Sequence, residues 1–401
     1  MKKGTMVNFY LKNKISPVRQ DIKKLYDHFQ RREALYRQLG ILSEFMYDRN
    51  IMEVGPGSGF NSLYVASLQP KQLVLIEPNP QGVKDINELF SKYDIGCNNI
   101  SIISKTVEDY SSYNSETYNF VFCEGLLGAA GVESPCHLFH TLADFVCPGG
   151  VLVVTCMDEI SYLSELIRRL FAHMIICDIA GVLSDKVEIL LPSFSPHLEL
   201  LEGMTRRYDD WIIDNLFNPS IYGPLFTIAD ALTALPEQLE FYSSSPHFVT
   251  DWRWYKDIYG PNRNFNQIAL QQYWENIHNL LDYRFTFPPR DVTLNKQLYQ
   301  ICKSIRHNIQ QYENNPKDDI LQTIRDELKN CIHNVNDFSP ETALSLQEAL
   351  DLLSVEKIEA NDVAEMRKFA GFFGRGQQYL SFTKRNVDNN AMNFGQNGII
   401  S

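Results

Sequence analysis

A carboxylate followed by three evenly spaced glycines is the pattern in this sequence best suited to chemistry. Glu53 ends a short apolar run, and Gly55, Gly57 and Gly59 follow at alternate positions before apolar residues return at helical spacing. Glycines leave the backbone bare, so a flat ligand can lie against it, and they accept the positive φ of a tight turn. A helix that begins here also offers N–H groups without helical partners. The pattern predicts a strand, a ligand-binding loop and a helix.

A second carboxylate follows the next apolar run. Glu77 ends this run, and its distance in sequence from Gly57 is the one at which nucleotide-binding folds place an acid on ribose hydroxyls. The dinucleotide fingerprint G-x-G-x-x-G is a poorer match, because Phe60 stands at its last position. An acid two residues before the first glycine also suits a ligand with an ammonium group better than a pyrophosphate. The spacing therefore argues against nicotinamide and flavin cofactors.

Taken together, these features resemble the class I methyltransferases that use S-adenosylmethionine. The resemblance continues through Val107, which follows Thr106 where the family usually has an acid, and Glu124 at the end of a fourth apolar run. It ends with a fifth strand behind a Pro-Gly-Gly turn in 147–155, and covers about residues 45–158. It implies an α/β fold with a Rossmann-like seven-stranded sheet, mostly parallel with the last strand antiparallel. N-terminal helices and a large helical insertion or cap complete the expected architecture.

The resemblance also implies S-adenosyl-L-methionine as the cofactor and a role for each matching residue. Glu53 would orient the loop and the methionine amine, and Gly55 to Gly59 would pass under the cofactor. Glu77 would take the ribose hydroxyls, the backbone N–H of Val107 would contact the adenine, and Glu124 would line the methionine end. No metal site is expected.

Methyl transfer from a sulfonium is an in-line displacement, so holding donor and acceptor at near-attack distance does much of the work. A general base is needed only for a hydroxyl or a protonated amine. We expect the catalytic groups at strand ends to be His247 and Glu159, with Asp158 beside the latter. His247 is preferred because histidine ordinarily titrates near neutral pH. The alternative is a histidine packed beside the aromatic and cationic stretch 251–256, which could stack on a sugar or aromatic acceptor.

The chain divides into four parts by pattern. Residues 1–48 are an N-terminal helical segment, and 49–254 with 371–385 are the methyltransferase domain, with a helical cap at about 159–236. A helical insertion at 255–370 separates strands six and seven, and 386–401 are expected to be disordered. The insertion would be a substrate lid or a surface for homo-oligomer formation.

The N-terminal segment carries four side chains able to contact a ligand, Arg31, Arg32, Tyr36 and Arg37. In the family that the chain resembles, such a segment often lies over the cofactor pocket, so one of them is a candidate for the methionine carboxylate or the acceptor. The alternative is a solvated basic face of a helix.

Composition narrows the function classes. The 401 residues carry a net charge of −12, from 37 basic and 49 acidic side chains, so nucleic acid is not an expected partner. Eight scattered cysteines without a C-x-x-C pair, and no secretory signal or membrane span, favour a cytoplasmic protein. The leading interpretation is methyl transfer to an O or N atom of a small-molecule or glycan-like acceptor. A protein methyltransferase and a non-catalytic assembly protein with this fold are the alternatives.

Overall fold

The protein is represented by a computed structural model that describes residues 9–10, 12–13, 25–93, 95–97, 99–127, 134–219, 223 and 225–385. The tail predicted from residue 386 lies outside the described residues.

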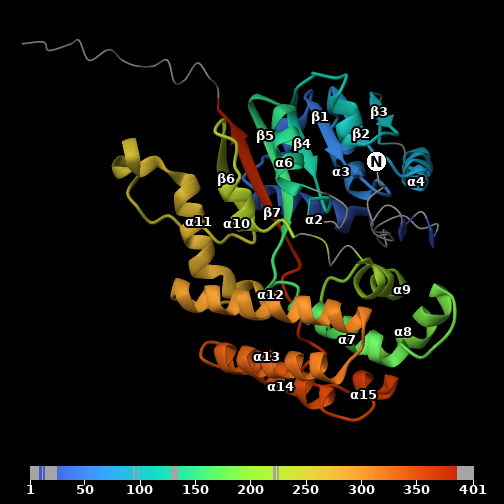
Figure 1. Cartoon of the computed structure of the whole chain (residues 1–401). Coiled ribbons are helices and arrows are strands. Elements are labelled where there is room, and N and C mark those ends of the chain that lie inside the picture. Colours follow the sequence, from blue (N-terminus) through green and yellow to red (C-terminus); the bar gives the residue numbers. More distant parts are fainter. Residues whose placement is uncertain are drawn as a thin grey trace, which may run out of the picture.

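Seven strands form one sheet, in the order β3-β2-β1-β4-β5-β7-β6 (Figure 1). The strands are β1 (Asn50–Val54), β2 (Gln72–Ile76), β3 (Ile100–Ile103), β4 (Tyr118–Cys123), β5 (Val146–Met157), β6 (Leu239–Ser245) and β7 (Gln377–Lys384). The pairs among β1 to β5 are parallel, and β7 runs antiparallel to both β5 and β6. This arrangement confirms the predicted fold class, including the antiparallel last strand.

Helices cover both faces of the sheet because its strands are apolar on both sides. Ile51 and Leu73 belong to the core shared with α2 (Leu25–Gln38), α3 (Phe60–Ser67) and α4 (Pro80–Lys92), whereas Met52 and Val74 belong to the core on the other side. That side carries α5 (Val107–Ser111), α6 (Pro135–Asp144) and α10 (Ile228–Thr233). Alternate residues of a strand point to opposite faces, so near-continuous apolar runs give two cores.

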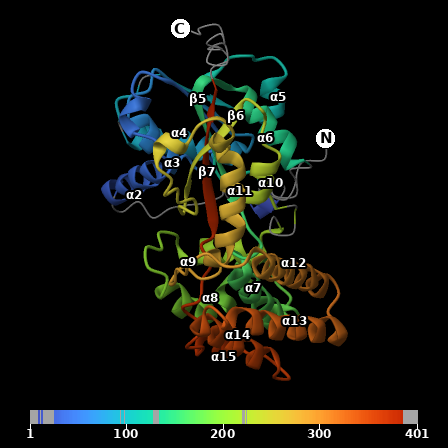
Figure 2. The same ribbon diagram turned by 90° about the vertical axis from the view of Figure 1, so that its left-hand side faces the viewer.

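A second layer of helices lies beyond the carboxyl ends of the parallel strands (Figures 1 and 2). It contains α7 (Leu163–Ile176), α8 (Leu183–Glu199), α9 (Tyr208–Ile212), α12 (Val292–Asn314), α13 (Asp318–Asn336), α14 (Pro340–Leu353) and α15 (Ala360–Ala364). Arg169 of α7 pairs with Glu313 of α12, and His197 of α8 bonds the carbonyl of Val363 in α15 at 2.8 Å. The stretches expected to be a separate cap and insertion therefore form one helical layer. Their division into domains stays a prediction.

The exit of β5 is fastened to the helical layer by two buried acids. Asp158 accepts a short hydrogen bond from the hydroxyl of Tyr273, on α11 (Phe265–Asn276), which runs from the sheet to the layer (Figure 2). Glu159 forms a bidentate ion pair with Arg306 of α12, with Nε to Oε2 at 2.8 Å and Nη2 to Oε1 at 3.1 Å. Both acids are at most 2% exposed. The layer is thus attached at the edge where the strands end.

The return from the layer into β7 is held by a fully buried arginine. Arg168 of α7 donates to the carbonyls of Phe369, Ala370 and Phe372 at 3.2, 3.0 and 2.8 Å. Close by, a Cβ built on Gly374 would lie 1.9 Å from the carbonyl oxygen of Ser161, so only glycine fits. These contacts fix the helical layer at the carboxyl ends of the parallel strands.

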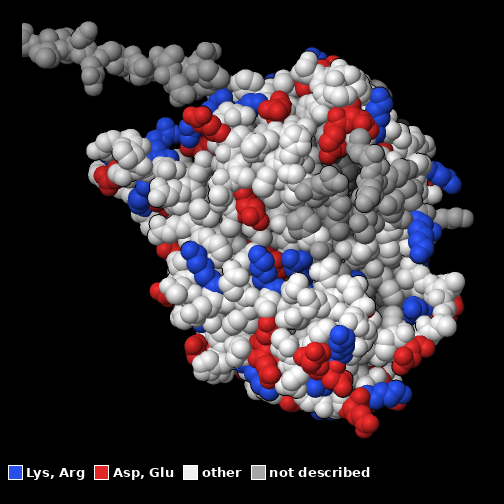
Figure 3. Space-filling view, viewed as in Figure 1, with Lys and Arg blue, Asp and Glu red and all other residues white. Residues whose placement is uncertain are grey.

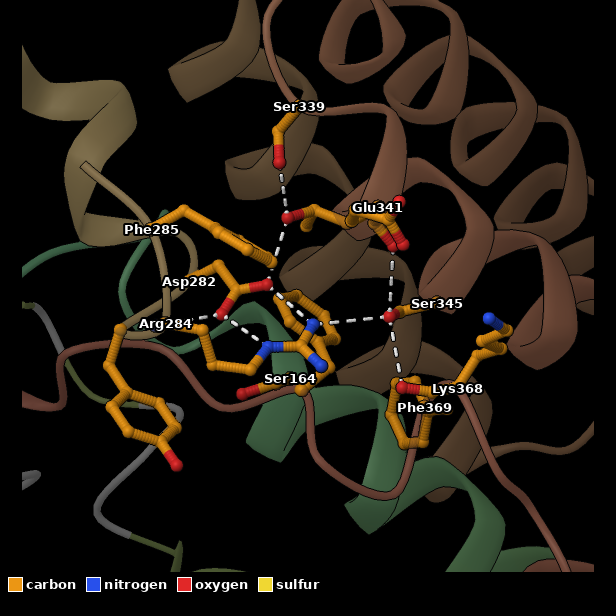
Figure 4. Close-up of polar contacts among 12 residues, drawn as sticks. Ser164, Asp282, Arg284, Phe285, Ser339, Glu341, Ser345, Lys368 and Phe369 are labelled. Carbon is orange, nitrogen blue, oxygen red and sulfur yellow. Dashed lines mark hydrogen bonds and ion pairs between the residues drawn. The ribbon is translucent and has the colours of Figure 1, made fainter. Parts of the chain in front are cut away.

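A polar cluster lies in the same layer, around the first turns of α14 (Figure 4). Asp282 accepts hydrogen bonds from Nε and Nη2 of Arg284, at 2.9 and 2.7 Å, and from the hydroxyl of Thr342 at 2.8 Å. Arg284 also donates to Ser345, whose hydroxyl reaches the carbonyl of Lys368 at 3.0 Å. The cluster joins α14 to the segment that precedes α12 and to the segment that follows α15. Its role is structural.

Basic and acidic side chains are interspersed on the face shown in Figure 3. Within the described ranges, every helix is too short or too polar to cross a bilayer.

Candidate active site

The loop after β1 has the backbone that its glycines predict. Gly55, Gly57 and Gly59 have φ values of 72°, 59° and 82°, in the left-handed region that other residues rarely adopt. Gly59 is also the residue before α3, and a Cβ there would lie 3.0 Å from Ile86 of α4. The loop therefore turns tightly and presents backbone without side chains at the carboxyl edge of the sheet.

Glu77 joins the loops that follow β1 and β2. Its Oε2 accepts the N–H of Gly57 at 2.9 Å and its Oε1 accepts the N–H of Asn79 at 2.8 Å. A Cβ on Gly82 would lie 2.9 Å from both Glu77 Cγ and the carbonyl oxygen of Gly57, so the first turn of α4 packs tightly on this junction. Burial raises the pKa of Glu77 to about 7, although both hydrogen bonds oppose the rise.

Glu53 belongs to β1, which directly precedes the same loop. It is 3% exposed and accepts a hydrogen bond from the hydroxyl of Ser62 at 2.6 Å. Burial, and then the nearby charge of Glu124, raise its pKa to about 7. Two acids with raised pKa values at the end of adjacent strands are typical of a functional site.

Glu124, at the exit of β4, is the centre of a partly buried polar triad with Arg32 and Asn61. Arg32 donates Nη1 to Oε2 of Glu124 at 2.9 Å and Nη2 to Oε1 by a shorter bond, and Asn61 donates Nδ2 to Oε2 at 3.0 Å. Among the described residues, Arg32 Nε and Asn61 Oδ1 are buried and have no hydrogen-bond partner. The triad thus leaves one free donor and one free acceptor beside a carboxylate.

The N-terminal helix α2 brings Arg32 to this position. His28 bonds the carbonyl of Phe60 at 2.9 Å, and Tyr36 accepts a bond from Arg32 at 2.8 Å. Of the four candidates in this segment, Arg32 and Tyr36 are buried, whereas Arg31 and Arg37 are exposed. Helical spacing alone does not show which of the four side chains are buried against the sheet domain.

Asn61 was not selected from the sequence. Its signal was modest: a polar residue in the first turn of the helix that follows the glycine loop. The structure brings it into the triad through its hydrogen bond to Glu124, a residue 63 positions away.

Val107 is the first residue of α5, directly after β3, which neighbours β2 in the sheet. Its side chain is buried, and the hydroxyl of Thr106 caps the helix by accepting the N–H of Asp109 at 3.1 Å. The backbone N–H of Val107 therefore lies at the same edge of the sheet as Glu77.

The two predicted catalytic residues lie apart from these acids. Glu159 is occupied by its ion pair with Arg306, and His247 is an exposed residue whose Nδ1 lies 3.5 Å from the hydroxyl of Ser243. In the described part of the chain, neither forms a hydrogen bond or ion pair with Glu53, Glu77 or Glu124. Their catalytic roles stay predictions. No group of three or more potential metal ligands occurs among the residues for which positions are described.

Comparison with known proteins gives matches in structure alone. No protein-family model matches the chain, and no curated protein sequence matches it significantly. Several solved structures are similar to this chain at low sequence identity.

N-methyltransferase NodS from Bradyrhizobium japonicum WM9, in complex with S-adenosyl-l-homocysteine, is 18% identical over 38% of this chain and 74% of its own, with a TM-score of 0.30. PKMT2 from Rickettsia typhi, in complex with AdoHcy, is 14% identical over 62% of this chain, with a TM-score of 0.41; the chain spans 50% of its length. Magnesium protoporphyrin IX methyltransferase (ChlM) from Synechocystis PCC 6803, with bound SAM, is 12% identical over 38% of this chain and 69% of its own, with a TM-score of 0.28.

The assignment of the fold rests on the sheet itself. Its seven strands, its antiparallel β7 and the glycine loop between β1 and α3 are those expected from the sequence resemblance. The chain has the class I methyltransferase fold.

Proposed function

We propose that this protein is an S-adenosylmethionine-dependent methyltransferase that modifies an O or N atom of a small-molecule or glycan-like acceptor. One observation carries the proposal: the glycine loop, the buried acids Glu53 and Glu77, and the Glu124 triad meet at one edge of the sheet. Open α/β sheets bind their ligands at this edge.

The free atoms of the triad match the amino-acid end of this cofactor. Asn61 Oδ1 is an acceptor suited to an ammonium, and Arg32 Nε–H is a donor suited to a carboxylate. The orientation of the Asn61 amide follows from its partner, because an ionised Glu124 can only accept. A zwitterionic α-amino acid would satisfy both atoms without breaking the Arg32–Glu124 pair.

The adenosine end would lie against the glycine loop, with Glu77 at the ribose hydroxyls and the Val107 N–H at the adenine. The charges agree with such a ligand, since Glu53 and Glu124 together with Arg32 give a net charge of −1 when both acids are ionised. The bound cofactor has a net charge of +1 and supplies an electrophilic methyl group on a sulfonium. The protein's own part is to hold the acceptor in line and keep water out.

The helical layer is the wall that supports an enclosed acceptor site. Its ties to the β5 exit, through Tyr273 and Arg306, keep it close to the edge that holds the cofactor residues. Tyr379 is half-buried near the start of β7; burial, and then the charge of Glu124, raise its pKa to about 12. His247 and Glu159 remain the proposed bases. A cytoplasmic location, and homo-oligomer formation through the helices, also remain proposals.

Calorimetric titration with S-adenosylmethionine and S-adenosylhomocysteine tests the proposal. We expect micromolar binding that is lost or strongly weakened in Gly57→Ala. Gly260→Ala is the matched control, because Gly260 has φ of 54° and open space around it, so it carries similar backbone strain away from the site. If well-folded protein binds neither compound, the protein is not a methyltransferase, and a non-catalytic assembly role gains support.

A further inference from the structure

A short surface loop carries four large aromatic side chains that the fold leaves in water. It comprises residues 251–263, between the edge strand β6 and α11, and is called the aromatic loop below. Trp252 is 92% exposed, Trp254 60%, Tyr255 71% and Tyr259 68%. Side chains of this size are usually largely buried, and a group of them outside the core marks an interaction surface.

The interior of the aromatic loop is polar. Arg253 forms a bidentate ion pair with Asp251, with Nε to Oδ1 at 2.8 Å and Nη2 to Oδ2 at 2.6 Å, and its Nη1 donates to the carbonyl of Asn262 at 2.7 Å. Gln272 of α11 fastens the start of the loop by bonding both the N–H and the carbonyl of Thr250, at 2.7 and 3.0 Å. Polar contacts thus hold the loop together while its rings face outward. Because these polar groups are paired, the cost of removing the loop from water is reduced.

Cations border the rings. Lys256 Nζ lies 4.8 Å from the ring centroid of Trp254, and Arg263 ends the loop. The loop has three basic residues and two acidic ones, a net charge of 3 − 2 = +1, on a chain whose net charge is −12. The loop projects from one corner of the molecule, and Figure 3 shows that corner as a protruding lobe (Figures 1 and 3). Small ligands bind in concave sites, so a convex lobe suits a broad and deformable partner.

We infer that the aromatic loop docks the protein on a lipid bilayer that carries anionic headgroups. Tryptophan and tyrosine rings favour the boundary between headgroups and acyl chains, and nearby lysine and arginine are attracted to anionic lipids. Insertion of the rings buries apolar surface, while Lys256 and Arg263 stay among the headgroups. Contact through this one loop would give the protein a single orientation on the bilayer. The inference is independent of the proposed function, because the loop contains none of the proposed cofactor contacts.

Vesicle flotation with the full chain tests this docking. The protein is mixed with vesicles of phosphatidylcholine alone, or of phosphatidylcholine with phosphatidylserine. We expect the protein to float with the mixed vesicles, and Trp252→Ala/Trp254→Ala to lower the partition coefficient by about tenfold or more. The matched control is Phe45→Ala/Tyr47→Ala, which removes two rings that are 64% and 66% exposed elsewhere on the surface. It should bind vesicles like the unchanged protein.

A charge variant keeps the test independent of the indoles. Lys256→Glu should weaken binding to the mixed vesicles and leave any binding to phosphatidylcholine alone unchanged. The inference is overturned if the unchanged protein floats with neither vesicle, or if the control loses as much binding as the tryptophan variant. A dimer that forms without vesicles and is abolished by Trp252→Ala/Trp254→Ala would also overturn it, and would assign the loop to a contact between two copies of the chain.

Discussion

Replacing Glu77 with glutamine should make the stability of the protein respond differently to pH. Burial raises the pKa of Glu77 from 4.5 to about 7, so the folded state favours the neutral carboxyl. The stability that this neutral form contributes is complete below pH 4.5 and is lost as pH rises through about 7. Glutamine does not titrate, so the variant does not suffer this loss. Between pH 5 and pH 8 its unfolding free energy should therefore rise by about 2 to 3 kcal/mol relative to that of the unchanged protein.

The comparison is made by urea unfolding of both proteins at the two pH values. The other buried acids, such as Glu53 and Asp158, titrate in both proteins and cancel in the difference. Glu88→Gln is the control, because Glu88 lies on α4 with a side chain that is 67% exposed. The amide that Glu77→Gln introduces has one acceptor oxygen and cannot serve both Gly57 and Asn79 as the carboxylate does, which adds a cost that does not depend on pH.

A difference that is the same at pH 5 and pH 8 would refute the reasoning, as would a variant that loses relative stability at pH 8. The same variant should bind S-adenosylhomocysteine more weakly by roughly 1.5 to 3 kcal/mol, since it loses a charge-assisted hydrogen bond to the ligand. Stability and binding would then change in opposite directions above neutral pH. Unchanged affinity would mean that Glu77 does not contact the cofactor.

Three further variants probe the site and its support. Arg32→Lys keeps the charge but removes Nε–H, so S-adenosylhomocysteine should bind about tenfold more weakly while 5′-methylthioadenosine, which lacks the amino-acid end, should bind as before; equal loss for both ligands in calorimetry would contradict this role. Arg306→Met leaves the buried charge of Glu159 unpaired and should cost about 3 to 5 kcal/mol in urea unfolding, much of it recovered when Glu159→Gln is added. Gly374→Ala places a Cβ 1.9 Å from the carbonyl oxygen of Ser161 and should lower the free energy of unfolding by about 3 kcal/mol or more. Urea unfolding that shows a variant as stable as the unchanged protein would contradict this prediction.

The cofactor half of the site could be predicted from sequence because its residues are local. A strand, a tight loop and a helix fall within about a dozen residues, and the loop needs glycine at positions whose φ is positive. Glu77 follows from the same reasoning, because parallel strands that end in register bring their exits to one edge. The apolar runs of the strands are typical of a sheet covered on both faces, which the structure has.

Tertiary structure decided the features that depend on long separations in sequence. Arg32 meets Glu124 across 92 residues, and Glu159 meets Arg306 across 147, so no local spacing could predict either pair. The expected cap and insertion proved to form one layer because each supplies helices with an apolar face that the other buries. The aromatic residues of the loop can be recognised in the sequence, but their exposure to solvent cannot be predicted from it. Local pattern determines backbone geometry and apolar faces, whereas the pairing of charges and the burial of rings depend on which surfaces meet when the whole chain folds.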